Sequence, residues 1–254
     1  MPKSMAIFWA SRSFSNDFIA AGIWGIPGFT TQTVRPDWMH CSCLGILQYL
    51  QGICLWEIFA SLGGTISGKN RFHHLHTMKV MFQVMARELG LEMPFWDITI
   101  PMFRSKTSMA PKLKLKAAEG RHFLPILRAT LQKCIEMESA HAQLRFQCVD
   151  AMDKCYKELD AWDDAASPLR LQRFGRMHLM LYGELNKEAG RARLLWLYYP
   201  KHHLFAHCTI SQTNPKLLWA YGFESEIGEA VLMTKGCNPA HLHHSVIERK
   251  RVLG

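Results

Sequence analysis

A helical repeat of apolar side chains runs through the middle of this chain and constrains its fold more than any other feature. Four segments have apolar residues three or four positions apart, as on one face of a helix: residues 43–62, 72–89, 121–159 and 169–188. Gly63 and Gly90 follow the first two segments as stop signals. The sequence therefore predicts a helical bundle between about residues 42 and 190.

A lysine-rich segment within this region has two interpretations. In residues 112–116 lysine and leucine alternate, which suits a strand, but Ala117 and the residues after it favour a helix. We expect a helix here. The candidate residues for binding nucleic acid are Lys112, Lys114, Lys116 and Arg121. The alternative is an ordinary solvated helix face.

The two ends of the chain differ from the middle. Residues 1–41 read as loops with one short strand near residues 30–34. Residues 194–199 fit a buried strand or a short helix, and the last residues read as a helix that is broken at Asn238-Pro239. We therefore expect three segments, 1–41, 42–190 and 191–254, of which the middle one is helical.

Composition narrows the class of protein. The chain has 254 residues, 48% of them hydrophobic, so it can bury a sizeable core. Its uninterrupted apolar runs are too short to cross a bilayer, and its eight cysteines have no regular spacing, so we expect a soluble intracellular protein with reduced thiols. The net charge of +9 favours a polyanionic partner, although a soluble protein can also be basic without such a partner.

Two short motifs have the spacing of metal ligands. Asp37 and His40 stand three residues apart, so on a helical turn their side chains point to the same side. His203 and His207 stand four apart, which puts two imidazoles on one helix face. The alternatives are a helix cap at Asp37 with a surface His40, and a chance pair in a chain with 13 histidines.

Glu224 is the candidate acidic ligand near the end of the chain. It lies among aromatic residues at the expected start of a helix, where a rigidly held carboxylate could bind magnesium. The alternative is a favourable charge at a helix N-terminus.

The order of these motifs resembles the C-terminal half of eukaryotic DDE transposases, most closely the CACTA-type transposases of plants. The matching blocks lie between about residues 30 and 250 and are short: residues 34–40, 115–125, 203–207, 221–228 and 238–249. Gly222 stands where the family has proline. The resemblance therefore rests on the order and spacing of the blocks more than on any one of them.

This resemblance implies an α+β, mainly helical fold, in which a partial RNase H-like core receives the large helical insertion of residues 42–190. It implies DNA cleavage and strand transfer in the intact family, with Glu224 as the last of three acids that hold Mg²⁺ or Mn²⁺. It also implies a structural Zn²⁺ held by Asp37, His40, His203 and His207. DNA would be the partner and the nucleus the location.

The first two acids of the triad have no convincing counterpart in this sequence. We therefore expect a transposase-derived fragment that is inactive alone, and whether it acts as an enzyme stays open. The alternative function is a non-catalytic basic helical module that binds nucleic acid or protein.

Overall fold

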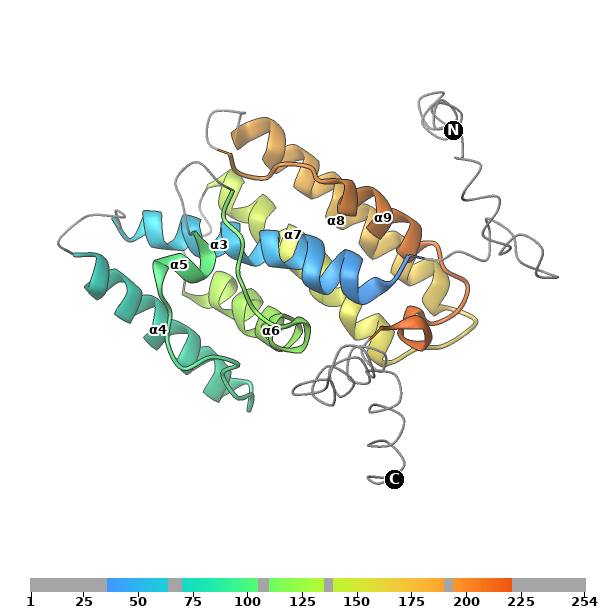
Figure 1. Cartoon of the computed structure of the whole chain (residues 1–254), viewed down its shortest axis with the longest axis horizontal. Helices are drawn as coiled ribbons and strands as arrows, with labels where there is room; N and C mark the ends of the chain where they lie inside the picture. The colour runs from blue at the N-terminus through green and yellow to red at the C-terminus, as the bar shows by residue number, and fades with distance from the viewer. Residues whose placement is uncertain (1–35, 64–69, 105–109, 135–138, 190–193, 221–254) are drawn as a thin grey trace, which may run out of the picture. The chain divides into compact units, whose positions relative to one another are not determined.

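The computed structural model describes residues 36–63, 70–104, 110–134, 139–189 and 194–220 (Figure 1). Every regular element within these residues is a helix. In chain order the helices are η2 (Met39–Ile46), α3 (Leu47–Ser61), α4 (Arg71–Glu88), α5 (Ile100–Phe103), α6 (Ala117–Lys133), α7 (Ala140–Asp160), α8 (Ser167–Ala189), α9 (Pro200–Thr209) and η4 (Pro215–Leu218). The described residues belong to one compact unit that begins at Pro36.

The prediction of an α+β fold with a partial RNase H-like core is wrong for the described residues, which contain no strand. Residues 194–199 form neither a strand nor a helix, because Leu194 and Trp196 have φ angles of 53° and 56°, which a strand does not contain. The side chain of Asn186 contacts this segment, because its Nδ2 donates a hydrogen bond to the carbonyl of Trp196 at 2.7 Å. The strand predicted near residues 30–34 lies outside the described residues.

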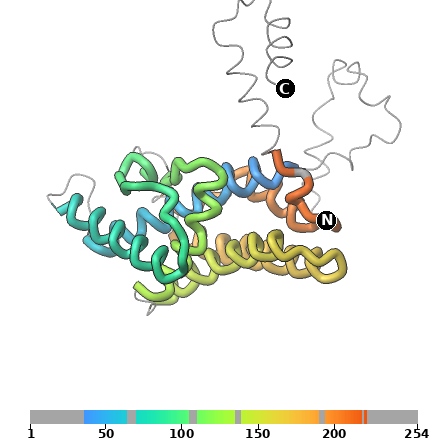
Figure 2. The backbone as a smooth tube through the Cα atoms, turned by 90° about the horizontal axis from the view of Figure 1, so that it is seen from below, coloured from blue at the N-terminus to red at the C-terminus, as the bar shows by residue number. Residues whose placement is uncertain are grey.

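Helix α3 lies at the centre of the unit. Figure 1 shows it between α8 and α9 on one side and α4 and α6 on the other, and its residues are buried on nearly all sides. Helices α7 and α8 run side by side and form the most extensive helix–helix contact (Figure 2). Helices η2 and α3 together, Met39–Ser61, are long and apolar enough to cross a membrane, but 72% of their most apolar window is buried within the unit. Their apolar side chains therefore serve the core of this fold.

The helices predicted over residues 43–62, 72–89 and 169–188 are confirmed, and the two glycine stops are confirmed as well. Gly63 and Gly90 have φ angles of 79° and 64°, the left-handed conformation in which a residue without a Cβ ends a helix at little cost.

The long helix predicted over residues 121–159 is interrupted. Helix α6 ends at Lys133 and α7 begins at Ala140. Ser139 caps α7, because its Oγ accepts the backbone N–H of Ala142 at 3.0 Å. The single helical pattern is therefore two helices that lie against each other.

Candidate functional site

The candidate site is the segment of residues 112–116, and the helix predicted there is wrong. The segment is non-helical, and α6 begins only at Ala117. Leu113 and Leu115 are buried, with 1% and 8% of their surface exposed, whereas Lys114 and Lys116 are exposed and Lys112 is half-buried. The alternation of the sequence thus decides which side chains face the core. The two leucines face the core and the three lysines lie on the opposite side. We call these three residues the lysine row (Lys112, Lys114 and Lys116).

Hydrogen bonds between helix α3 and the backbone of residues 112–116 hold this segment in place. The N–H of Leu113 donates to the Gln48 carbonyl at 2.8 Å, and the Gln48 side-chain amide donates to the Leu115 carbonyl at 2.8 Å. Gly52 makes the close approach possible, since a Cβ there would lie 2.6 Å from the backbone N and Cα of Lys112 and the N of Leu113. The position of the lysine row therefore depends on a glycine one turn along α3 from Gln48.

Replacing Gly52 by Ala is expected to destabilise the protein by about 1–3 kcal/mol, because the added methyl group meets backbone atoms that no rotamer change can move. Urea unfolding measures this. Gly120→Ala in α6 is the matched control, since its Cβ would meet only side-chain atoms, Gln51 Oε1 at 3.4 Å and Leu47 Cδ2 at 3.9 Å, and the change gains helix propensity. Equal losses in the two variants would contradict the close approach at Gly52.

The ammonium groups of the lysine row have no carboxylate partner in the part of the chain that the structure describes. Among the described residues, none of its three lysines forms an ion pair, and Lys201 of α9 forms none either. Lys201 Nζ instead donates to the backbone carbonyls of His40 at 2.8 Å and Leu44 at 3.3 Å. Burial, followed by the charges of Lys201 and Lys114, lowers the pKa of Lys112. Positive charge is therefore concentrated where residues 112–116 meet the start of α9.

Arg121 differs from the three lysines with which it was grouped. Its guanidinium lies 2.5 Å from Asp160 and stands over the ring of Trp219 at 5.3 Å. Lys216 pairs with the same carboxylate. In the structure Arg121 therefore joins α6 to the end of α7 and to the residues after η4.

The Asp37 carboxylate mainly accepts hydrogen bonds from backbone N–H groups. Its carboxylate accepts the N–H groups of Met39 at 3.3 Å and His40 at 2.8 Å, and lies 2.5 Å from His40 Nδ1. It also accepts the N–H of Ala220 at 3.1 Å. The early Asp37–His40 turn thus meets the late part of the described chain, four residues before Glu224, which lies outside the described residues.

His203 and His207 face each other on α9, with 3.1 Å between their Nε2 atoms. Burial and the charge of His203 lower the pKa of His207. Helix α9 packs on η2, and Cys208 Sγ donates to the Pro36 carbonyl at 3.5 Å. Yet within the described ranges no three or more His, Cys, Asp or Glu side chains come close enough to hold a metal ion. The Asp37–His40 and His203–His207 pairs do not form the four-ligand set there, and zinc binding stays a prediction.

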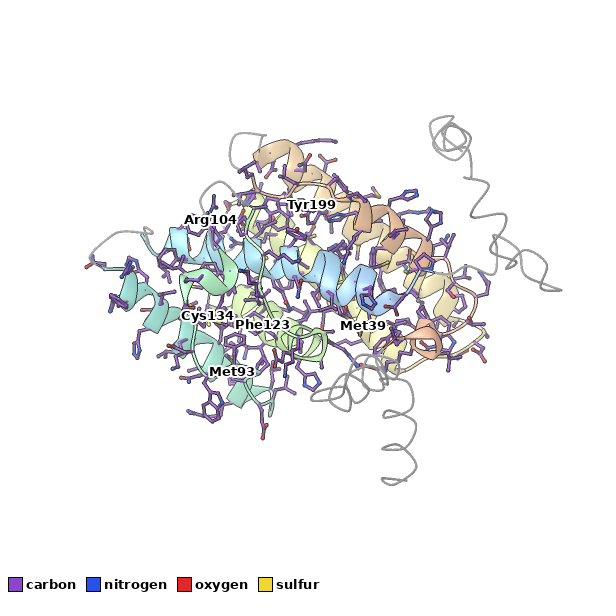
Figure 3. All side chains as sticks on the ribbon, in the orientation of Figure 1. Met39, Met93, Arg104, Phe123, Cys134 and Tyr199 are labelled. Atoms are coloured by element: carbon purple, nitrogen blue, oxygen red, sulfur yellow. The ribbon has the colours of Figure 1, made fainter. Side chains whose placement is uncertain are left out.

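Sequence reasoning missed two features of this region. No sequence pattern singled out Lys201, and none linked Tyr49 of α3 to Tyr199, which precedes α9. The two tyrosine rings stack with centroids 4.0 Å apart and planes inclined by 20°. Figure 3 shows Tyr199 beside α3. A spacing of 150 residues hides such a pair from any local pattern.

Comparison with protein-family models, curated proteins and solved structures finds no match to this chain. The resemblance to transposases therefore rests on the sequence blocks alone. The function has to be proposed from the geometry of the lysine row and its surroundings.

Proposed function

We propose that this protein is a non-catalytic helical module that binds nucleic acid, with the lysine row and Lys201 as its main phosphate contacts. The observation that supports this is the set of lysines held outward by two buried leucines without a described carboxylate partner. A lysine that is already paired with an acid attracts a phosphate less strongly, because the nearby carboxylate offsets its positive charge.

The energy of such binding comes from ion release. A lysine that neutralises a phosphate sets free a counterion condensed on the nucleic acid, so affinity falls as salt rises. The net charge of +9 adds a long-range attraction but no defined contact. A fixed row of lysines supplies defined contacts, and the number of lysines that contact phosphate sets the salt dependence.

The triple change Lys112→Gln, Lys114→Gln and Lys116→Gln is expected to weaken duplex DNA binding more than tenfold at low salt. It should reduce the slope of log K against log salt by about 2–3, since each phosphate contact contributes about 0.9. Fluorescence anisotropy with a labelled 20-base-pair duplex at several salt concentrations measures both quantities.

A matched triple change removes the same charge elsewhere. Lys133, Lys154 and Lys187 each pair with an acid, namely Glu88, Asp150 and Glu184. Replacing these three lysines by Gln should change affinity and slope much less. Equal losses in both triple variants would reduce the effect to net charge, and no binding by the wild type would end the proposal.

The proposal is limited to binding. Glu224 lies outside the described residues, and the RNase H-like core that cleavage needs is not found in the described ones. Descent from a transposase, a nuclear location and a catalytic Mg²⁺ or Mn²⁺ stay predictions from the sequence.

A further inference from the structure

Aromatic rings lie beside the lysine row on one face of α3. Tyr49 and Trp56 are seven residues apart, so they share a face about 10 Å apart along the helix. Each ring lies under a cation from the connection between α5 and α6. Lys112 Nζ is 5.2 Å from the Tyr49 centroid, and the Arg104 guanidinium is 4.2 Å from that of Trp56. Two pairs of a cation and an aromatic ring therefore lie along this face of α3.

Tyr49 and Tyr199 form the aromatic centre of this surface, and both rings are partly exposed. Burial, followed by the neighbouring Tyr49, raises the pKa of Tyr199 to about 12. This phenol stays neutral near pH 7 and brings no negative charge beside Lys112 and Lys201. The surface thus combines an uncharged stacking platform with unneutralised lysines.

We propose that the basic aromatic patch formed by Tyr49, Tyr199, Lys112, Lys114 and Lys201 binds single-stranded nucleic acid. A base takes the place of the Lys112 ammonium over the Tyr49 ring, and the released Lys112 contacts an adjacent phosphate together with the other lysines. This inference rests on the proposed function and adds strand selectivity to it. In a duplex the bases are already paired and stacked, so only an open strand can offer a base to the rings.

The simpler role of the tyrosine pair is to fasten the start of α9 to α3. A purely structural role predicts loss of stability without any change in preference between single and double strands. The two roles therefore differ in a measurable quantity, which is the ratio of the two affinities.

The test measures the affinity of the full chain for labelled dT20, rU20 and a 20-base-pair duplex by fluorescence anisotropy. The wild type is expected to bind the single strands more tightly than the duplex. Tyr49→Leu should weaken single-strand binding about tenfold, since stacking of one base contributes on this order, and should leave duplex affinity within twofold. Tyr49→Phe keeps the ring and should bind nearly as the wild type does. The ratio of dT20 to rU20 affinity identifies DNA or RNA as the preferred strand.

Trp96→Leu is the matched control, because Trp96 is 95% exposed and lies in the loop after α4. Met93 of that loop lies on the other side of α3 from Tyr199 (Figure 3). This variant should bind every probe as the wild type does. Circular dichroism of each variant checks that it is folded.

Two results would overturn the inference. One is a wild type that binds the duplex at least as tightly as dT20 and rU20, a measurement that needs no variant to fold. The other is a folded Tyr49→Leu variant that keeps its single-strand affinity. In both cases salt-dependent binding that is lost with the lysine row would leave the proposed function intact, whereas absence of binding to all three probes would end both.

Discussion

Two buried histidines are expected to contribute a loss of about 4 kcal/mol of stability, about 2 kcal/mol for each, when the pH falls from 7.5 to 5. His178 of α8 is 0% exposed and His202 of α9 is 2% exposed. Burial lowers the pKa of each to about 4, from an unperturbed value of 6.5. The unfolded chain therefore binds more protons below pH 6.5, and stability is lost as the pH falls from 6.5 towards 4.

The surroundings of both rings explain why they resist protonation. His178 Nδ1 donates to the Cys148 carbonyl at 3.0 Å, and its Nε2 has no partner among the described residues. The N–H of Tyr199 donates to His202 Nδ1 at 3.0 Å, and the Tyr199 carbonyl lies 3.3 Å from the same nitrogen. Burial lowers the pKa of His202 and outweighs the contact with the Tyr199 backbone, which raises it. The neighbouring Cys148 and Tyr182 have pKa values raised by burial, so they are neutral and offer no anion.

Urea unfolding at pH 7.5, 6 and 5 tests this with the double variant His178→Asn, His202→Asn. Asn can keep one hydrogen bond at each position but does not titrate, so the variant should lose much less stability on acidification than the wild type. His76→Asn, at an exposed position of α4, should retain the wild-type pH dependence. If the double variant lost as much stability as the wild type by pH 5, another group would have to be responsible.

His141 acts in the opposite direction and makes the comparison between variants necessary. Its hydrogen bond with Glu57 raises its pKa, against the effect of burial. That contribution is present below pH 6.5 and is lost as the pH rises through the raised pKa. The total pH dependence therefore mixes two signs, and only the difference between wild type and double variant isolates His178 and His202.

The helices could be predicted from sequence because their signals are local. Apolar residues of α3 recur at the helical period, and Gly63 and Gly90 mark two ends. Residues 112–116 could not be assigned in this way, since their backbone partners are Gln48, 65 residues before Leu113, and the end of α5, which is near in sequence but belongs to no regular pattern with this segment. The alternation of lysine and leucine was informative about burial but not about a regular element.

The candidate site was predicted only in part. Lys112, Lys114 and Lys116 were named from charge alone, whereas the pairing of Arg121 with Asp160 needed the packing of α6 on α7. The expected RNase H-like sheet is not found in the described residues, because short degenerate blocks fix residue types without fixing a backbone. One available signal was not used: Glu57 is an acid within the apolar residues of α3, and a buried acid needs partners from elsewhere in the fold.

Replacing Glu57 by Leu is expected to cost about 3–5 kcal/mol, because it leaves a buried guanidinium without its counter-charge. Glu57 Oε2 accepts from Arg145 at 3.0 Å, and these side chains are only 12% and 6% exposed. Glu57 Oε1 also accepts from Trp196 Nε1 at 2.8 Å. Burial raises the pKa of Glu57, but its bond to His141 and the charge of Arg145 outweigh this, and the pKa is lowered overall.

A double-mutant cycle in urea at pH 7.5 separates the ion pair from general packing. Glu57→Leu with Arg145→Leu removes both charges, and it should recover most of the stability lost in Glu57→Leu, since buried pairs can often be exchanged for apolar residues at little cost. Glu184→Leu is the surface control: its pair with Lys187 is 55% and 72% exposed, so it should cost below about 1 kcal/mol. A double variant as unstable as the sum of its two single variants would show that charge pairing is not what joins α3 to α7 at this point, and that the cost comes from lost packing.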